Sequence, residues 1–156
     1  MSPSPAPGPT PLLHVMLLDR AVSALLAEAL RDAPLKAHDY GIVSAIQEQP
    51  GVSASALAAQ FSVPLTTVAE WLSRLTEQGI LRRERDPADR RRHQLWLTEA
   101  GRATMAQTRE AFGRGYLAFV EHLPVPPEEA SAQLEAMTQA CRGALDSLVS
   151  VRDGKV

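Results

Sequence analysis

Apolar residues recur at helical spacing along most of this chain. In the segment 12–30 they are Leu13, Leu17, Leu18, Val22, Leu25 and Leu26. This spacing predicts a helix over 12–30, which Pro34 separates from the next element. A second helix is predicted over 37–49, because apolar residues again recur there and the Pro50-Gly51 pair follows.

Two short helices separated by a tight turn are predicted between residues 53 and 78. Ser53 is a favourable N-cap for a helix over 54–61, and Pro64 is tolerated in the first turn of the next helix, over 65–78. That second helix divides into an apolar face and a polar face when its residues are placed 100° apart. The apolar face holds Val68, Trp71, Leu72 and Leu75, and the polar face holds Thr66, Glu70, Ser73 and Glu77. A glycine, Gly79, follows as a C-terminal cap, so the segment is predicted to be a helix-turn-helix.

Residues 79–101 change to a period of two. Ile80 and Leu81 begin one short run, and Leu95 and Leu97 lie two apart in the other, which predicts two β-strands. Between the runs, the sequence Asp86-Pro87-Ala88-Asp89 is typical of a turn. The segment therefore predicts a hairpin whose tip carries three arginines. Trp96 alternates with the two leucines and is expected on the outer face of its strand.

Long helices are predicted on both sides of this central segment. One runs from about residue 99 to 123 with an apolar stripe, and Pro124 and Pro126 end it. The last begins at Pro127, whose acidic neighbours suit a helix N-terminus, and continues to about residue 150. The first and last helices have apolar stripes larger than a small domain covers by itself. They are therefore expected to bury each other across a twofold axis between two copies of the chain.

The predicted fold class is mainly α (α+β). A winged helix-turn-helix domain over residues 35–98, with a two-stranded β wing at about 80–98, is flanked by dimerisation helices over 12–34 and 99–150. Residues 1–11 alternate proline with small residues, which favours a flexible, extended tail. A chain of 156 residues is the size of one domain or one subunit of an oligomer.

Charge is unevenly distributed along the chain. The formal net charge is −2, yet residues 53–96 hold seven arginines and five acids, so this segment carries +2 and the remainder −4. Affinity for a polyanion is therefore expected only at this local surface. Asp19, Arg20 and Glu28 interrupt the most apolar stretch, which excludes a membrane span, and a single cysteine excludes an intramolecular disulfide. A soluble, cytoplasmic protein is expected.

Together these segments resemble the MarR family of winged helix-turn-helix transcriptional regulators, most clearly over residues 35–103. The matching residues are Ala56-Leu57-Ala58, Leu72, Leu75, Gly79-Ile80-Leu81, Arg83, Asp86-Pro87, Asp89-Arg90-Arg91 and Leu97-Thr98-Glu99-Ala100-Gly101. The order and spacing of these short pieces make the resemblance specific. It implies a homodimer whose recognition helices enter successive major grooves of double-stranded DNA while the wings reach the adjacent minor grooves. The two helices would lie about 34 Å apart on a pseudo-palindromic operator.

The recognition helix and the wing supply the predicted DNA contacts. The N-terminal residues of a recognition helix meet base edges, so Thr66 and Thr67 are placed to read bases or bind phosphate. The resemblance implies that Asp89 orients a neighbouring arginine and that Arg91 or Arg90 enters the minor groove. Relatives often carry a basic or neutral residue where this chain has Glu70, which repels phosphate but can accept a hydrogen bond from a cytosine amino group. The predicted DNA-binding residues are Ser53, Pro64, Thr66, Thr67, Glu70, Arg74, Arg90, Arg91 and Arg92.

The resemblance also implies a small-molecule effector, in such families an aromatic acid or a lipophilic toxin, that releases a repressor from its operator. The expected pocket lies between the first two helices, the start of the long helix and the back of Trp71. His14 and His38 are candidates for polar contacts there. Trp71 has a second interpretation as ordinary core, because it recurs with Val68, Leu72 and Leu75.

Other functions were weighed against this one. A winged-helix module that binds an acidic protein partner and no DNA would use the same arginines. An oxidant sensor would use Cys141, but this cysteine recurs with Leu134, Met137, Leu145 and Leu148, which predicts a buried and inert thiol. No enzyme is expected, because the sequence contains no phosphate-binding glycine loop, nucleophile elbow or paired carboxylates. The four histidines lack metal-ligand spacing, so neither a metal nor a cofactor is expected.

Overall fold

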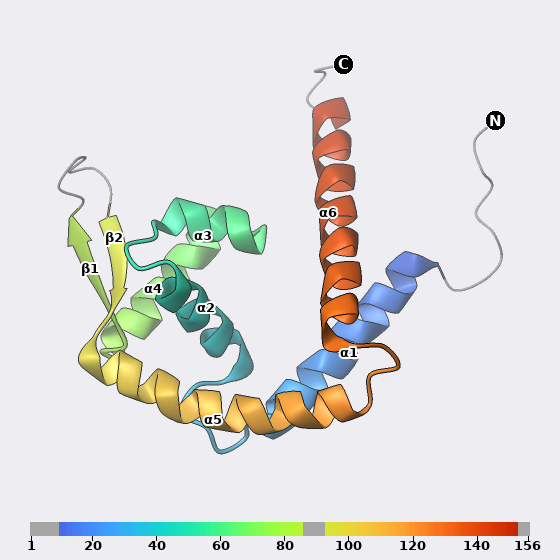
Figure 1. Ribbon diagram of the computed structural model, residues 1–156. Coiled ribbons are helices and arrows are strands. Elements are labelled where there is room, and N and C mark those ends of the chain that lie inside the picture. The colour runs from blue at the N-terminus through green and yellow to red at the C-terminus, as the bar shows by residue number, and fades with distance from the viewer. Residues whose placement is uncertain (1–9, 86–92, 153–156) are drawn as a thin grey trace. The chain divides into compact units, whose positions relative to one another are not determined.

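The structure is a computed structural model that describes residues 10–85 and 93–152 (Figure 1). In chain order its elements are α1 (Pro11–Ala29), α2 (Ala37–Glu48), α3 (Ala54–Phe61), α4 (Leu65–Glu77), β1 (Leu81–Arg85), β2 (His93–Leu97), α5 (Glu99–Glu121) and α6 (Pro127–Arg152). Each helix was predicted to within two residues of these bounds. The two strands form one antiparallel sheet, as expected for a wing. Residues 1–9 of the predicted tail (1–11) and the tip of the hairpin (86–92), with Asp89, Arg90, Arg91 and Arg92, lie outside the described residues. The other two tail residues belong to the first helix, because the Thr10 hydroxyl caps α1 and Pro11 begins it.

The chain divides into two compact units, residues 1–115 and 116–156. The first contains α1 to α4, the hairpin and most of α5, and the second contains the end of α5 and all of α6. The hydrophobic core belongs to the first unit. It joins α2, α3, α4, both strands and the start of α5 around buried side chains that include Val43, Ile46, Leu57, Val68, Leu72, Leu75, Leu81, Leu95 and Met105.

The predicted apolar face of α4 is buried. Val68, Leu72 and Leu75 are at most 1% exposed, and Trp71 is half-buried against the same core. The predicted polar face, from Thr66 to Glu77, is exposed. Trp71 therefore packs against the core as the core interpretation expects, and its contact with an effector stays a prediction. Burial of Val68, Leu72 and Leu75 fixes the rotation of α4 about its axis.

The ends of α3 and α4 are closed by local hydrogen bonds. The Ser53 hydroxyl accepts from the Ala56 backbone N–H at 3.2 Å, which confirms the predicted N-cap. The chain leaves α4 through Gly79 at φ 71°, where the N–H of Gly79 donates to Thr76 and that of Ile80 donates to Leu75. This double hydrogen bond requires a left-handed residue, which glycine adopts without strain.

The turn between α3 and α4 uses the same geometry without a glycine. Ser62 has φ 54°, and the N–H of Val63 donates to the Ala58 carbonyl at 3.0 Å. The sequence predicts Pro64 in the first turn of α4, but Pro64 is the N-cap of that helix. The reason is its ψ of 146°, which is extended, so that the helix begins at Leu65.

Hydrogen bonds from the loop before α3 attach the hairpin to the helices. The N–H of Gly51 donates to the Leu95 carbonyl at 3.0 Å, and the N–H of Leu95 donates to the Val52 carbonyl at 3.1 Å. Leu95 and Leu97 are buried, whereas Trp96 between them is half-buried. The alternation of the strand is therefore as predicted, with Trp96 on the outer face.

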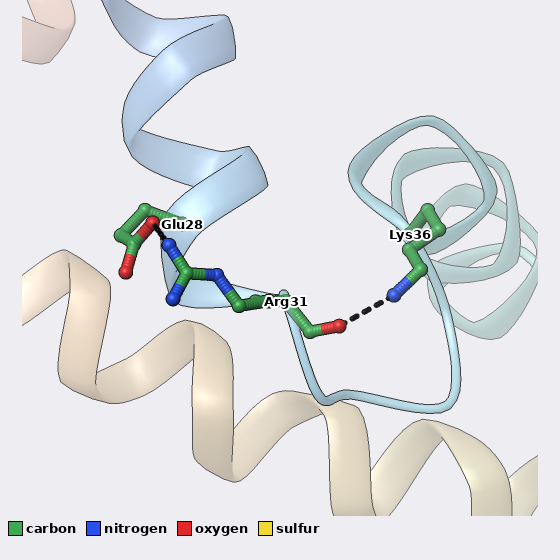
Figure 2. Close-up of polar contacts among 3 residues, drawn as sticks. All are labelled: Glu28, Arg31 and Lys36. Atoms are coloured by element: carbon green, nitrogen blue, oxygen red, sulfur yellow. Dashed lines mark hydrogen bonds and ion pairs between the residues drawn. The ribbon is translucent and has the colours of Figure 1, made fainter.

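The connection from α1 to α2 is held by charged side chains (Figure 2). Glu28 and Arg31 form an ion pair, and the Lys36 ammonium donates to the backbone carbonyl of Arg31 at 2.6 Å. Leu30 and Leu35, at the two ends of this connection, are 1% and 2% exposed. These contacts close the loop while its apolar ends are buried.

The junction between β2 and α5 explains the Leu-Thr-x-x-Gly sequence. The Thr98 hydroxyl donates to the Gly79 carbonyl at 2.6 Å and accepts from the Gly101 N–H at 2.8 Å. The N–H of Thr98 donates to the Ile80 carbonyl at 3.0 Å. At Gly101 an added Cβ would lie 2.1 Å from the Ile80 carbonyl oxygen. The start of α5 is thus joined to the end of α4 with no space for a side chain.

Large apolar side chains remain exposed on α1 and on α6. Those of α1 are Leu12, Leu13, Met16, Leu17, Leu18 and Val22, and those of α6 are Leu134, Met137, Leu145, Leu148, Val149 and Val151. Cys141 is exposed as well, so the predicted burial of this thiol is wrong for a single chain. The reason is that residues 131–152 of α6 are all exposed, and nothing in the described part of their unit, residues 116–152, covers the stripe.

Substitution of Gly101 tests the junction. Gly101→Ala is expected to lower the free energy of unfolding by roughly 1–3 kcal/mol, because the new methyl group meets a backbone carbonyl. Gly113→Ala in the same helix is the control: it has no atom within 4 Å of the added Cβ and should stabilise by about 0.5–1 kcal/mol. Chemical denaturation of both variants measures the difference. Equal stability of the two would contradict the close approach.

Candidate nucleic-acid interface

The exposed face of α4 begins at its first turn. Leu65 is 52% exposed, and Thr66 and Glu70 are also exposed, one turn apart. Thr67 is half-buried beside them. A helix that presents its N-terminal turn in this way has the form needed to enter a major groove.

The two predicted residues that precede the helices have different surroundings. The Ser53 hydroxyl caps α3 and also lies 3.0 Å from the Ser55 hydroxyl. Pro64 is exposed at the start of α4. Ser53 lies at the N-terminal end of α3, and Pro64 lies at the N-terminal end of α4. Their contact with DNA stays a prediction.

Arg74 forms an ion pair that no spacing in the sequence indicates. Its guanidinium donates to the carboxylate of Asp39, in the first turn of α2, at 2.5 Å. The Asp39 side chain is only 15% exposed and that of Arg74 is 48% exposed. The pair joins α4 to α2 and holds the Arg74 side chain against the protein. Its predicted DNA contact is untested.

The wing carries arginines along β1 as well as at its tip. Arg82, Arg83 and Arg85 are exposed on this strand. Arg82 forms an ion pair with Glu84, and its guanidinium carbon lies 5.9 Å from the centre of the Trp96 ring. The basic surface therefore begins at the base of the wing, before residues 86–92.

Two of the three predicted effector-binding residues lie together. The rings of His38 and Trp71 meet edge to face, with centroids 4.4 Å apart, and the Phe61 ring centroid lies 6.1 Å from that of Trp71. His14 is exposed on α1, and no contact between it and this pair is found in the described part of the chain. A hollow of about 360 Å³ lies instead between residues 28–34 and residues 107–114 of α5. None of the three predicted residues lines it.

Neither a metal cluster nor a membrane span is found in residues 10–85 and 93–152. No group of three or more His, Cys, Asp or Glu side chains there lies in a position to hold a metal ion. No described helix is long and apolar enough to cross a membrane.

Helix α4 follows a tight turn and buries one face, and a hairpin that bears arginines comes after it. This arrangement defines a winged helix-turn-helix protein. Residues 35–93 match the model of the MarR family. Over this segment, which contains the helix-turn-helix and most of the hairpin, the resemblance seen in the sequence is confirmed.

Two curated relatives are regulators by name. Transcriptional regulator HosA of Escherichia coli O111:H- is 40% identical over 67 residues, which are 43% of this chain and 50% of HosA. A putative transcriptional regulatory protein for the hcr operon of Thauera aromatica is 35% identical over 75 residues, which are 48% of this chain and 45% of that relative. The match therefore spans about half the length of these relatives. Neither is named as an enzyme.

Solved structures share the fold over most of the chain. The transcriptional repressor CouR, bound to a 23-mer DNA duplex, has a TM-score of 0.74 at 21% identity, with 85% of this chain and 92% of CouR covered. The PcaV regulator of Streptomyces coelicolor, in complex with its natural ligand, has a TM-score of 0.71 at 21% identity, with 92% and 99% covered. These likenesses confirm the predicted fold class.

A double-mutant cycle tests the ion pair between α2 and α4. Asp39→Ala and Arg74→Ala are expected to couple by about 0.5–1 kcal/mol in the free energy of unfolding, because Asp39 is largely shielded from water. The matched control is the pair Glu110 and Arg114, whose side chains are 81% and 69% exposed. It should couple by at most about 0.5 kcal/mol. Coupling no larger at Asp39 than at Glu110 would remove the proposed link between the two helices.

Proposed function

We propose that this protein is a cytoplasmic, homodimeric, sequence-specific DNA-binding transcriptional regulator, a repressor released by a small-molecule effector. The observation that carries the proposal is the rotation of α4. Val68, Leu72 and Leu75 on its apolar face are at most 1% exposed, while Thr66 and Glu70 face outward beside a basic wing. The similarity in fold to CouR, a repressor solved bound to a DNA duplex, supports DNA binding.

Dimerisation follows from the exposed apolar faces of α1 and α6. Each face carries six large side chains that are at least 36% exposed in the single chain. Contiguous apolar surface of this kind marks an interface, and a twofold pair buries the same surface on both copies. A dimer presents two α4 helices and so reads a pseudo-palindromic operator.

The effector acts by changing the spacing of the two DNA-reading heads. Only a ligand that binds one spacing more tightly than the other can shift this equilibrium. PcaV, of similar fold, was solved with its natural ligand, which supports a ligand-responsive regulator. The rings of Trp71 on α4 and His38 on α2 offer an aromatic surface, which suits a small aromatic effector.

One charge on the apolar stripe of α6 is expected to weaken dimerisation. Leu148→Glu places a carboxylate on the apolar stripe of α6, where desolvation of the charge opposes association. Ser150→Glu is the control, because residue 150 lies on the opposite side of the helix at 100° per residue. Light scattering after size-exclusion chromatography should give a dimer for the wild type and for Ser150→Glu, and a larger monomer fraction for Leu148→Glu. A wild-type monomer at micromolar concentration would remove the dimeric operator model.

Selection of binding sites from random duplex DNA tests the function itself. A palindromic site with half-sites about one helical turn apart is expected. Arg91→Ala should then weaken binding to that site by roughly fivefold to a hundredfold and leave the dimer intact. The alternative, a winged-helix module that binds only an acidic protein, predicts no enriched sequence. It also predicts no preference for one duplex over bulk DNA in a gel-shift titration at fixed salt.

A further inference from the structure

The arginines on the two faces of strand β1 have different surroundings. Leu81, Arg83 and Arg85 alternate with Arg82 and Glu84, so the two sets lie on opposite faces of the sheet. In the antiparallel register the first set pairs with Leu97, Leu95 and His93. The face that begins with buried leucines therefore continues outward through Arg83, Arg85 and His93. We call these three residues the inner wing face.

The inner wing face borders a hollow of about 240 Å³ at the base of the hairpin. Its apolar lining comes from Leu65, Leu72 and Leu95, and its polar lining from Ser53, Ser55, Arg83 and His93. The start of α3, the start of α4 and both strands thus meet at one place, beside the exposed first turn of the recognition helix. Figure 1 shows these elements in contact, with β1 and β2 adjoining α4 and α3.

Charge distinguishes the inner face from the outer one. On the outer face Arg82 is paired with Glu84 and lies over Trp96. No acidic side chain lines the hollow, and no ion pair joins Arg83 or Arg85 to another residue within 10–85 and 93–152. The positive charge of the inner face is therefore not offset by a carboxylate in that part of the chain.

We propose that the inner wing face binds the sugar-phosphate backbone of the DNA duplex whose major groove α4 enters. Arg83 and His93 donate to one phosphate, and Arg85 lies toward the next phosphate along the strand. The Ser55 hydroxyl is the polar group on the α3 side of the hollow, and the exposed Leu65 side chain is the apolar surface against which a deoxyribose rests. The contact rests on the proposed DNA-binding function. It is separate from the predicted minor-groove contact of residues 90–92.

This contact fixes where the recognition helix lies in the groove. Phosphate contacts set the register and orientation of a protein on the duplex without reading its sequence. Because β1 and α4 belong to one core, a phosphate held at Arg83 also sets the depth of Thr66 and Glu70. The inner wing face is therefore expected to contribute to affinity for every sequence.

Arg82 and Arg83, which are neighbours on opposite faces of β1, provide the test. On the duplex enriched from random DNA, Arg83→Ala should weaken binding about tenfold at fixed salt and reduce the slope of log affinity against log salt by about one. Arg82→Ala is the matched control and should stay within about twofold of the wild type. The triple variant Arg83→Ala, Arg85→Ala and His93→Ala should lose more affinity, yet keep the ratio of specific to non-specific binding. Arg83→Lys should retain the salt slope.

The outcomes separate this contact from the function on which it rests. Wild-type affinity and salt slope in the triple variant, or an equal loss in Arg82→Ala and Arg83→Ala, would overturn the inner-face contact while DNA binding stands. Failure of the wild type to enrich or bind any duplex would overturn both. Thermal melting of each variant shows whether a loss of affinity comes instead from unfolding.

Discussion

The burial of one face of α4 is the constraint on which the rest of the interface depends. Val68, Leu72 and Leu75 lie at the centre of the core, so α4 cannot rotate without exposing them. Their burial leaves Thr66 and Glu70 at the surface by the geometry of the helix alone. The same apolar contacts that stabilise the domain therefore decide which side chains of α4 stay exposed for the proposed contact with base edges. Stability and the proposed recognition share one helix but use opposite sides of it.

The wing is held to this helix by a small number of hydrogen bonds. Leu95 pairs with the backbone of residues 51 and 52, and Thr98 joins the end of α4 to the start of α5. These bonds and the buried leucines attach the base of the hairpin to the same core as α4. Alternation along β1 then divides its arginines between two faces, one neutralised by Glu84 and one continuous with the helix-turn-helix. A hairpin with the same composition but a register shifted by one residue would exchange these faces.

Helices α1 and α6 leave stripes of large apolar side chains exposed, unlike the helices of the core. The stripes of α1 and α6 remain exposed in the single chain, and the exposed thiol of Cys141 lies in the second stripe. Thr10 caps α1, and α6 has acidic residues in its first turn, yet large apolar side chains of both helices stay exposed in the part of the chain that the structure describes. Association of two copies would bury these side chains, and the same association would place two recognition helices on one duplex. The proposed function thus depends on surfaces that are distant in sequence from the DNA-reading residues.

Local patterns in the sequence were sufficient for the secondary structure and for the exposed face of α4. Helical periodicity, the Ser53 cap, Gly79 and the alternation around Trp96 are short-range signals, and the structure confirms each of them. Only the tertiary structure brought Asp39 to Arg74, seated Gly101 on the Ile80 carbonyl and separated Arg82 from Arg83 by their surroundings. The exposure of Cys141 also became visible only in the tertiary structure. Helical spacing indicates that a residue shares a face with apolar residues, but not whether another element covers that face. Such contacts join residues far apart in the chain, and their geometry depends on how the elements pack, which no spacing within one element records.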